Sequence, residues 1–194
     1  MNEGNYYLAK TSLGLKRKYE LSADDGSGKP GELLGYAEKQ LKLSEEVVLY
    51  RDKTKNEPLA RLREKADVSQ FSGDGFDVVD AQGELLGSVT RDLRASLRRP
   101  TWQVEQPGLG AMVGVQRGKP TAARSMAGLV GMVADVVNPV SKRAFDFTLN
   151  DKQMFSISKV KRLDDLYLIK LDDPAVDRTL VFVASVALEM IEQR

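Results

Sequence analysis

Residues 173–194, DPAVDRTLVFVASVALEMIEQR, contain a long apolar segment that constrains how the rest of the chain folds. Ten of the twelve residues from 180 to 191 are apolar, and at 3.6 residues per turn they surround almost the whole of a helix. The polar positions form a narrow stripe of Arg178, Ser185, Glu189 and Glu192. A helix that is apolar on nearly every side has to be enclosed by protein or lipid. Twelve residues rise about 18 Å, short of the roughly 30 Å hydrocarbon core of a bilayer, so we expect a protein shell.

Asp173 and Pro174 are expected to begin this helix, because aspartate caps free N–H groups and proline lacks one at a position where none is needed. Neighbouring carboxylates in a turn point apart, and no calcium-loop spacing is present. Adjacent acidic residues are therefore expected to act as turn formers and caps, and the sequence nominates no metal site. These pairs are Asp24-Asp25, Asp164-Asp165 and Asp172-Asp173.

The amino-acid composition limits the classes of function that are possible. With 194 residues and 42% hydrophobic content, residues 1–194 are expected to form a single domain with a sizeable core. The chain has no cysteine and no histidine, which excludes disulfides, thiolate catalysis, histidine-ligated zinc and Ser-His-Asp machinery. No spacing of carboxylates, lysines, tyrosines or serines nominates a catalytic set, so we expect a non-enzymatic protein without a cofactor. The N-terminal MNEGNYYLAK has no signal-peptide pattern, which favours a cytoplasmic location, peripheral to a membrane if lipid is bound.

Upstream of the apolar segment the sequence repeats a hairpin pattern. In each unit, β-branched and aromatic runs flank a turn rich in Gly, Asp, Asn or Pro. Strands are expected at 6–10, 13–21 and 33–41, hairpins at 47–63, 76–91, 102–117 and 145–159, and a last strand at 166–171. The total is about twelve strands.

A dozen antiparallel strands with short turns form a sandwich or close into a barrel, and closure removes the sheet edges. A barrel of eleven or twelve strands leaves room for a helix along its axis. The sequence therefore predicts a mainly β fold, a twelve-stranded closed antiparallel barrel around a buried C-terminal helix. Residues 120–137, PTAARSMAGLVGMVADVV, predict one extra helix loosened by Gly128 and Gly131, either packed across one barrel end or acting as a mobile lid.

Three stretches carry a family resemblance: FDVVDAQGELLGSVTR (76–91), FDFTLNDKQMFSISK (145–159) and LYLIKLDDPAVDRTLVFVASVALEM (166–190). In their order of hairpins, strand and closing apolar helix, they resemble the tubby C-terminal-like superfamily, in particular its phospholipid scramblase and LURP-one-related branch. The resemblance covers nearly the whole chain. It implies a twelve-stranded barrel around a central helix, and by analogy the binding of phosphoinositides through basic residues on the barrel.

Clustered basic residues are the candidates for ligand contact. Four arginines crowd residues 91–100, RDLRASLRRP, with Asp92 as the one acid among them, and two lysines share a face of the strand at 13–21. These residues are Lys16, Lys18, Arg91, Arg94, Arg98 and Arg99. Each such charge contributes on the order of 1 kcal/mol near an anionic membrane surface. The alternative is a solvated face whose charges are balanced by nearby acids.

The partners that follow are an anionic phospholipid or membrane surface or another phosphate-bearing ligand. The alternative function is a protein-interaction or small-ligand-binding barrel with no lipid role, and a third is an enzyme that uses carboxylates in a barrel-end cleft. A net charge of +1 and 7% aromatic content argue against a nucleic acid partner. The sequence carries no signal for a particular oligomeric state.

Arg17 and Glu189 indicate a polar contact inside the barrel. Arg17 alternates with Leu15 and Tyr19 on the apolar face of its strand, and Glu189 interrupts the apolar helix. Since a buried charge without a partner is costly, we expect an inward basic residue, Arg17 first, to pair with Glu189 or Ser185. The alternative places Glu189 beyond the barrel rim in water.

Residues 26–31, GSGKPG, match the pattern G-x-G-x-x-G. The dinucleotide motif requires a helix that opens at the third glycine and directs N–H groups at a pyrophosphate. Pro30 removes one donor, and residues 32–41, ELLGYAEKQL, have the pattern of a strand. A turn between two strands is therefore predicted.

Overall fold

The computed structural model describes residues 4–13, 16–40, 46–65, 72–96, 99–117, 144–160 and 165–191. The helix expected at 120–137 lies outside these ranges. The elements in chain order are β1 (Gly4–Leu13), β2 (Lys16–Asp24), β3 (Pro30–Gln40), β4 (Glu46–Tyr50), β5 (Pro58–Glu64), β6 (Ser72–Asp80), β7 (Leu85–Asp92), α1 (Leu93–Ser96), β8 (Thr101–Gln106), β9 (Gly110–Gln116), β10 (Ala144–Leu149), β11 (Lys152–Lys159), β12 (Leu166–Leu171) and α4 (Arg178–Ile191).

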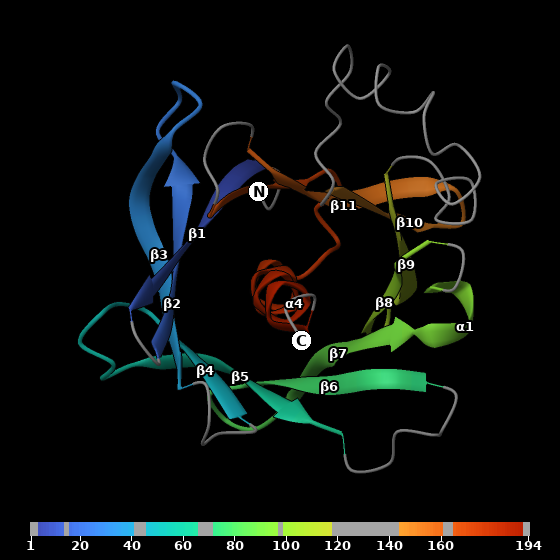
Figure 1. The fold of residues 1–194 in the computed structure, drawn as a ribbon, viewed down its shortest axis with the longest axis horizontal. Helices are drawn as coiled ribbons and strands as arrows, with labels where there is room; N and C mark the ends of the chain where they lie inside the picture. Colours follow the sequence, from blue (N-terminus) through green and yellow to red (C-terminus); the bar gives the residue numbers. More distant parts are fainter. Residues whose placement is uncertain are drawn as a thin grey trace, which may run out of the picture.

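The twelve strands form one closed barrel in which sequential strands are neighbours and β1 pairs with β12 (Figure 1). Every pairing is antiparallel, and the four predicted hairpins are β4–β5, β6–β7, β8–β9 and β10–β11. Closure through the first and last strands satisfies backbone groups that an open sheet would leave at its edges. The predicted fold class is confirmed.

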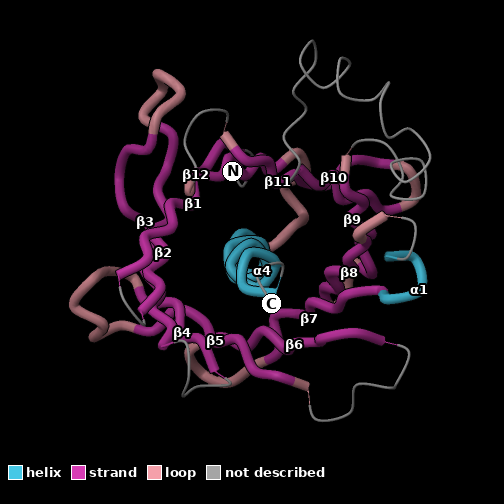
Figure 2. Tube along the Cα trace, viewed as in Figure 1, coloured by secondary structure: helices cyan, strands magenta, loops and turns pink. Residues whose placement is uncertain are grey.

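Helix α4 lies along the barrel axis, surrounded by strands on all sides (Figures 1 and 2). All residues from 180 to 190 are buried. Phe182 packs edge-on against Tyr6 of β1 with a ring-centroid distance of 5.1 Å. The prediction of a protein shell around this segment is confirmed. In the part of the chain that the structure describes, no helix is both long enough and apolar enough to cross a membrane.

The start of α4 differs from the prediction. The helix begins at Arg178, and the Asp177 carboxylate accepts the N–H of Leu180 at 2.8 Å, so Asp177 is its N-cap. Asp173 instead accepts the N–H of Ala175 at 2.8 Å, within a separate turn that precedes the helix. The prediction that Asp173 and Pro174 open the helix was therefore wrong by one turn.

Gln106, at the end of β8, holds the turn that leads into α4. Its side-chain amide donates to the carbonyl of Ala175 at 2.9 Å and accepts the N–H of Asp177 at 2.8 Å. One side chain thus satisfies two backbone groups that the turn leaves unpaired. The helix is thereby tied to the barrel wall at its first turn.

The turn chemistry follows the sequence. Asn150 and Asp151 both have positive φ, at 49° and 63°, as a two-residue hairpin loop with the matching twist requires. In the β2–β3 connection, Gly26 and Gly28 have φ of 86° and 81°, and their N–H groups both bond Asp24 Oδ1. Residues 26–31 therefore form a strand-to-strand turn, as predicted.

Two glycines allow close contacts inside the wall. A Cβ on Gly87 would lie 2.2 Å from the carbonyl oxygen of Glu105 and 2.7 Å from a methyl group of Leu180. A Cβ on Gly114 would lie 2.3 Å from the ring of Phe147. Such distances are far below van der Waals contact, so the helix and the aromatic ring pack directly on backbone at these positions.

Candidate functional site

A pocket of about 470 Å³ opens beside the N-terminal turns of α4. Its size falls within the range of about 300–1,000 Å³ that is common for small-molecule sites. The apolar part of its lining consists of Leu33, Leu34, Leu49, Leu59 and Phe182. The polar part consists of Glu32, Arg51, Asp52, Arg178 and Thr179. The pocket therefore combines an apolar surface with charged groups, which suits an amphiphilic molecule.

The pocket lies at a seam in the barrel wall between β3 and β4. In the described part of the chain these strands pair at only two positions, Tyr36 with Tyr50 and Ala37 with Leu49. β4 ends at Tyr50, so within the described ranges no strand pairing joins residues 30–35 of β3 on that side. Leucines from both strands and the Phe182 ring of α4 line the resulting opening. The seam thus gives a molecule outside the barrel access to a helix that is otherwise enclosed.

Arg178 supplies the available positive charge of the pocket. Its guanidinium lies 5.9 Å from the ring centroids of both Tyr6 and Phe182, a cation–π arrangement that holds the charge over the aromatic pair. Among the described residues, no carboxylate forms an ion pair with Arg178. The other lining arginine, Arg51, is already paired with Glu57 at 2.8 Å.

The two acids of the lining, Asp52 and Glu32, also differ in whether neighbouring residues bind them. Asp52 accepts the backbone N–H and the hydroxyl of Thr54, at 2.8 Å and 2.6 Å, and these two bonds hold its pKa below the ordinary value. Glu32 is exposed, and no bond or ion pair from its side chain to another described residue is present. A ligand in the pocket therefore meets the charges of Arg178, Glu32 and Asp52, since the bonds from the neutral groups of Thr54 leave the Asp52 carboxylate ionised.

The structure does not bring the predicted basic residues together on one face. Lys16 and Lys18 lie on β2, whereas the arginines lie on β7 and on the α1 connection to β8, and β7 is the fifth strand from β2 around the closed barrel (Figure 1). The two groups therefore occupy different sides of the molecule.

Lys16 belongs to a balanced network on the outer face of β2 and β3. Its ammonium pairs with Glu38 at 3.1 Å, and Lys55 pairs with the same carboxylate at 3.0 Å. The Tyr36 hydroxyl donates to Glu38 at 3.0 Å. The hydrogen bond from Lys55, followed by those from Lys16 and Tyr36, lowers the pKa of Glu38 to about 2. For Lys16 the geometry agrees with the alternative of a charge-balanced face; the partly buried Lys18 forms no ion pair with another described residue.

The arginine segment is described in part. The side chain of Arg94 and all of Arg98 lie outside the described residues. Arg99 is partly buried, and its backbone N–H bonds the carbonyl of Ala95 at 3.2 Å. Arg91 lies on the inner side of β7, two positions after the fully buried Val89. A solvent-facing cluster built on Arg91 is therefore not what the structure shows.

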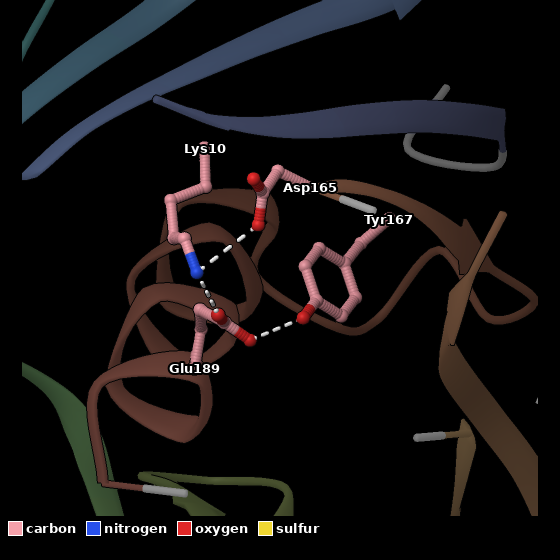
Figure 3. Close-up of polar contacts among 4 residues, drawn as sticks. All are labelled: Lys10, Asp165, Tyr167 and Glu189. Atoms are coloured by element: carbon pink, nitrogen blue, oxygen red, sulfur yellow. Dashed lines mark hydrogen bonds and ion pairs between the residues drawn. The ribbon is translucent and has the colours of Figure 1, made fainter. Parts of the chain in front are cut away.

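Glu189 lies inside the barrel and is paired with a basic residue, but that residue is Lys10. Lys10 Nζ lies 2.8 Å from Glu189 Oε1 and 3.1 Å from Asp165 Oδ1, and the Tyr167 hydroxyl donates to Glu189 Oε2 (Figure 3). The expectation of an inward cation is met, and the alternative that places Glu189 in water is excluded. The expected partners do not hold: Ser185 donates instead to the carbonyl of Val181 at 2.8 Å, within α4.

Arg17 lies near this cluster without bonding Glu189. Its influence falls on Tyr19, a fully buried residue on the same face of β2. Burial, followed by the negative charge of Glu189, raises the pKa of Tyr19 to about 12, and the guanidinium of Arg17 opposes that shift. Arg17 therefore opposes the effects of burial and of Glu189 on the Tyr19 hydroxyl.

Alternation along the first strand marks Lys10 as an inward-facing cation. Tyr6, Leu8 and Lys10 alternate along β1 on its inner face, as Arg17, Tyr19 and Leu21 do on β2. No comparable signal marks the pocket, because its lining comes from β3, β4, β5 and α4 and depends on where one strand pairing stops.

No protein-family model matches the chain, and no curated protein matches it. The resemblance to the tubby-like and scramblase-related proteins therefore stays a prediction. In the described ranges, no group of acidic residues has an arrangement that holds a metal ion.

Proposed function

We propose that this chain is a non-enzymatic binding module for an anionic amphiphile, of which an anionic phospholipid is the principal case. The observation that carries the proposal is the pocket at the β3–β4 seam, where leucines and Phe182 adjoin the uncommitted guanidinium of Arg178. An aliphatic chain gains about 0.8 kcal/mol for each methylene group that it buries. The headgroup then meets a positive charge at the mouth.

Arg178 is suited to this contact because its guanidinium lies over the rings of Tyr6 and Phe182. A guanidinium that is already oriented loses little freedom when it binds a phosphate or carboxylate. Glu32, at the same pocket, disfavours a headgroup that carries only negative charge close to it. We therefore expect one negative group of the headgroup at Arg178, and tighter binding of phosphatidylserine, whose ammonium can offset the acidic lining, than of a monoalkyl phosphate, which carries no positive group.

Vesicle flotation tests the membrane form of this proposal. The protein is mixed at low salt with phosphatidylcholine vesicles that contain or lack phosphatidylserine. We expect binding to the serine-containing vesicles, and Arg178→Gln is expected to weaken it about fivefold, the effect of one charge near an anionic surface. The matched control is Arg63→Gln, which removes an exposed arginine paired with Glu46 and away from the pocket.

A soluble arm separates lipid in a bilayer from a free ligand. Calorimetry with monomeric dodecyl phosphate measures binding without a membrane, and inorganic phosphate measures the headgroup alone. Binding of dodecyl phosphate without vesicle binding assigns the pocket to a soluble amphiphile. Equal loss in Arg178→Gln and Arg63→Gln, or no binding in either arm, overturns the proposal and favours a protein-interaction barrel.

A further inference from the structure

We infer that Arg91 and Trp102 form a second binding site, for a carboxylate or phosphate oxygen, on the inner side of the barrel wall. The two residues are directly opposite each other in the register of β7 and β8. Val89 and Val104, two positions along each strand, form the next opposed pair and are fully buried core residues. Because side chains alternate along a strand, Arg91 and Trp102 share this inner face.

Within the part of the chain that the structure describes, each residue has a buried N–H group without a hydrogen-bond partner. Trp102 is 0% exposed, and its indole Nε1 makes no hydrogen bond. Arg91 Nε is likewise buried and unpaired, although the residue as a whole is partly exposed. Buried donors are nearly always satisfied, and two unsatisfied donors on facing positions of adjacent strands call for a shared acceptor.

The chemistry of the two groups defines the ligand. An indole N–H and a guanidinium can only donate, so the ligand has to offer acceptor oxygens. The permanent charge of the guanidinium selects an anion, and charge-assisted bonds to carboxylate or phosphate oxygens are its strongest interactions. The adjacent Asp92 is exposed and accepts the N–H of Ala95 at 2.9 Å, so it is committed to capping α1.

Arg61 provides a comparison for the Arg91–Trp102 pair, because it has a similar unpaired donor in a different setting. Arg61 of β5 also has a buried, unpaired Nε, but the inner positions on either side of it are Ala60 and Leu62, which places Arg61 on the outer face. Its terminal nitrogen lies 4.0 Å from Glu46. Arg61 therefore has an acid in reach and no indole opposite, and it serves as the matched control.

Trp102 is the single tryptophan of the chain, so its fluorescence reports on this site directly. Sodium phosphate and sodium acetate are titrated into the whole chain at constant ionic strength, with chloride as the reference anion. We expect a saturable change in emission with one of the two oxyanions and none with chloride. The stronger oxyanion identifies the ligand class as phosphate or carboxylate.

Substitutions test whether the fluorescence change arises from an anion bound at Arg91 and Trp102. Arg91→Gln is expected to weaken the oxyanion at least about tenfold, whereas Arg61→Gln leaves the titration unchanged. Trp102→Phe has no tryptophan emission, so its anion binding is measured by the anion-induced rise in melting temperature. We expect this rise to be smaller than in the unsubstituted protein but not abolished, because the Arg91 donor remains. Arg178→Gln leaves this titration unchanged, which separates the site from the pocket at the β3–β4 seam.

Two results would overturn the inference. One is the absence of a saturable response to either oxyanion, which assigns the donors to an internal water only. The other is an equal response in the Arg91→Gln protein. If Arg91→Gln does not fold, Arg91→Lys and Trp102→Phe carry the test, since the first keeps the charge and loses the Nε donor.

Discussion

Lys10 Nζ lies 2.8 Å from Glu189 Oε1, and the two side chains are 8% and 4% exposed. One residue belongs to the first strand and the other to the helix that follows all twelve strands. The contact therefore links the barrel wall to the C-terminal end of the enclosed helix α4, whereas the seam pocket lies beside the N-terminal turns of that helix. Asp165 also pairs with Lys10, and the Tyr167 hydroxyl donates to Glu189.

Breaking this pair is expected to destabilise the fold. Lys10→Met leaves a buried carboxylate without its cation, which costs about 3–5 kcal/mol in comparable buried pairs. Glu189→Gln is expected to cost less, because the amide can keep the bond from Tyr167 and Lys10 keeps Asp165. Urea unfolding measures both. In the double variant the loss should be smaller than the sum, and strict additivity would show that the two charges do not interact.

Acid should remove the contribution of Glu38. Its pKa is lowered from 4.5 to about 2 in the folded protein, so the ionised carboxylate stabilises the fold fully above about pH 4.5. That stabilisation is lost as the pH falls through about 2. We therefore expect Glu38→Gln to be less stable than the unsubstituted protein at pH 7, with the difference shrinking toward pH 2. A difference that is independent of pH would contradict this assignment.

Alanine at the two close-contact glycines should reduce stability unequally. At Gly87 the new Cβ meets the backbone carbonyl of Glu105, which cannot move without shifting β8. At Gly114 it meets the ring of Phe147, a buried side chain that can move only by displacing the stacked ring of Phe155. Overpacking costs typically about 1–3 kcal/mol, and we expect Gly87→Ala at or above the top of that range. Gly4→Ala, which meets only the end of the Tyr6 side chain at 3.3 Å, is the control for thermal unfolding.

The N-cap of α4 can be assigned by substitution. Asp177→Ala removes the acceptor of the Leu180 N–H and should cost about 1 kcal/mol, measured by urea unfolding. Glu84→Ala, which removes an exposed carboxylate in the β6–β7 turn, is expected to have little effect. If Asp177→Ala matched Glu84→Ala, the capping bond would not contribute to stability.

Filling the seam pocket should abolish its occupancy without unfolding the barrel. Thr179 lines the pocket and is partly exposed, so Thr179→Phe places a ring in the opening while the core stays intact. We expect dodecyl phosphate binding to fall below detection by calorimetry, with the melting temperature little changed. Undiminished binding in this variant would place the amphiphile elsewhere.

The fold was predictable because it rests on patterns that are local in the sequence. Alternation within each hairpin fixed which side chains face inward, and the all-round apolar stretch from 180 to 190 needed an enclosing wall. The helix start was misplaced because Asp173 and Asp177 are both good caps, and the choice between them depends on Gln106, which is distant in the sequence.

The sites were harder to predict, since they depend on contacts between elements that no local pattern encodes. Glu189 was expected to find an inward cation, and it did, but Lys10 and Arg17 have the same alternation and only the barrel register distinguishes them. The position of Arg91 shows the converse. Its charge suggested a surface cluster, whereas the alternation of side chains along β7 places it on the inner face.

Because α4 follows every strand in chain order, a ribosome completes the wall before it makes the residues that fill it. A nascent chain that has released all twelve strands still lacks its core, and β1 has to wait for β12 before the cylinder can close. Hairpins already formed at that stage expose their apolar faces to solvent or to a chaperone. Committed folding is therefore expected to begin only after the helix has emerged from the exit tunnel.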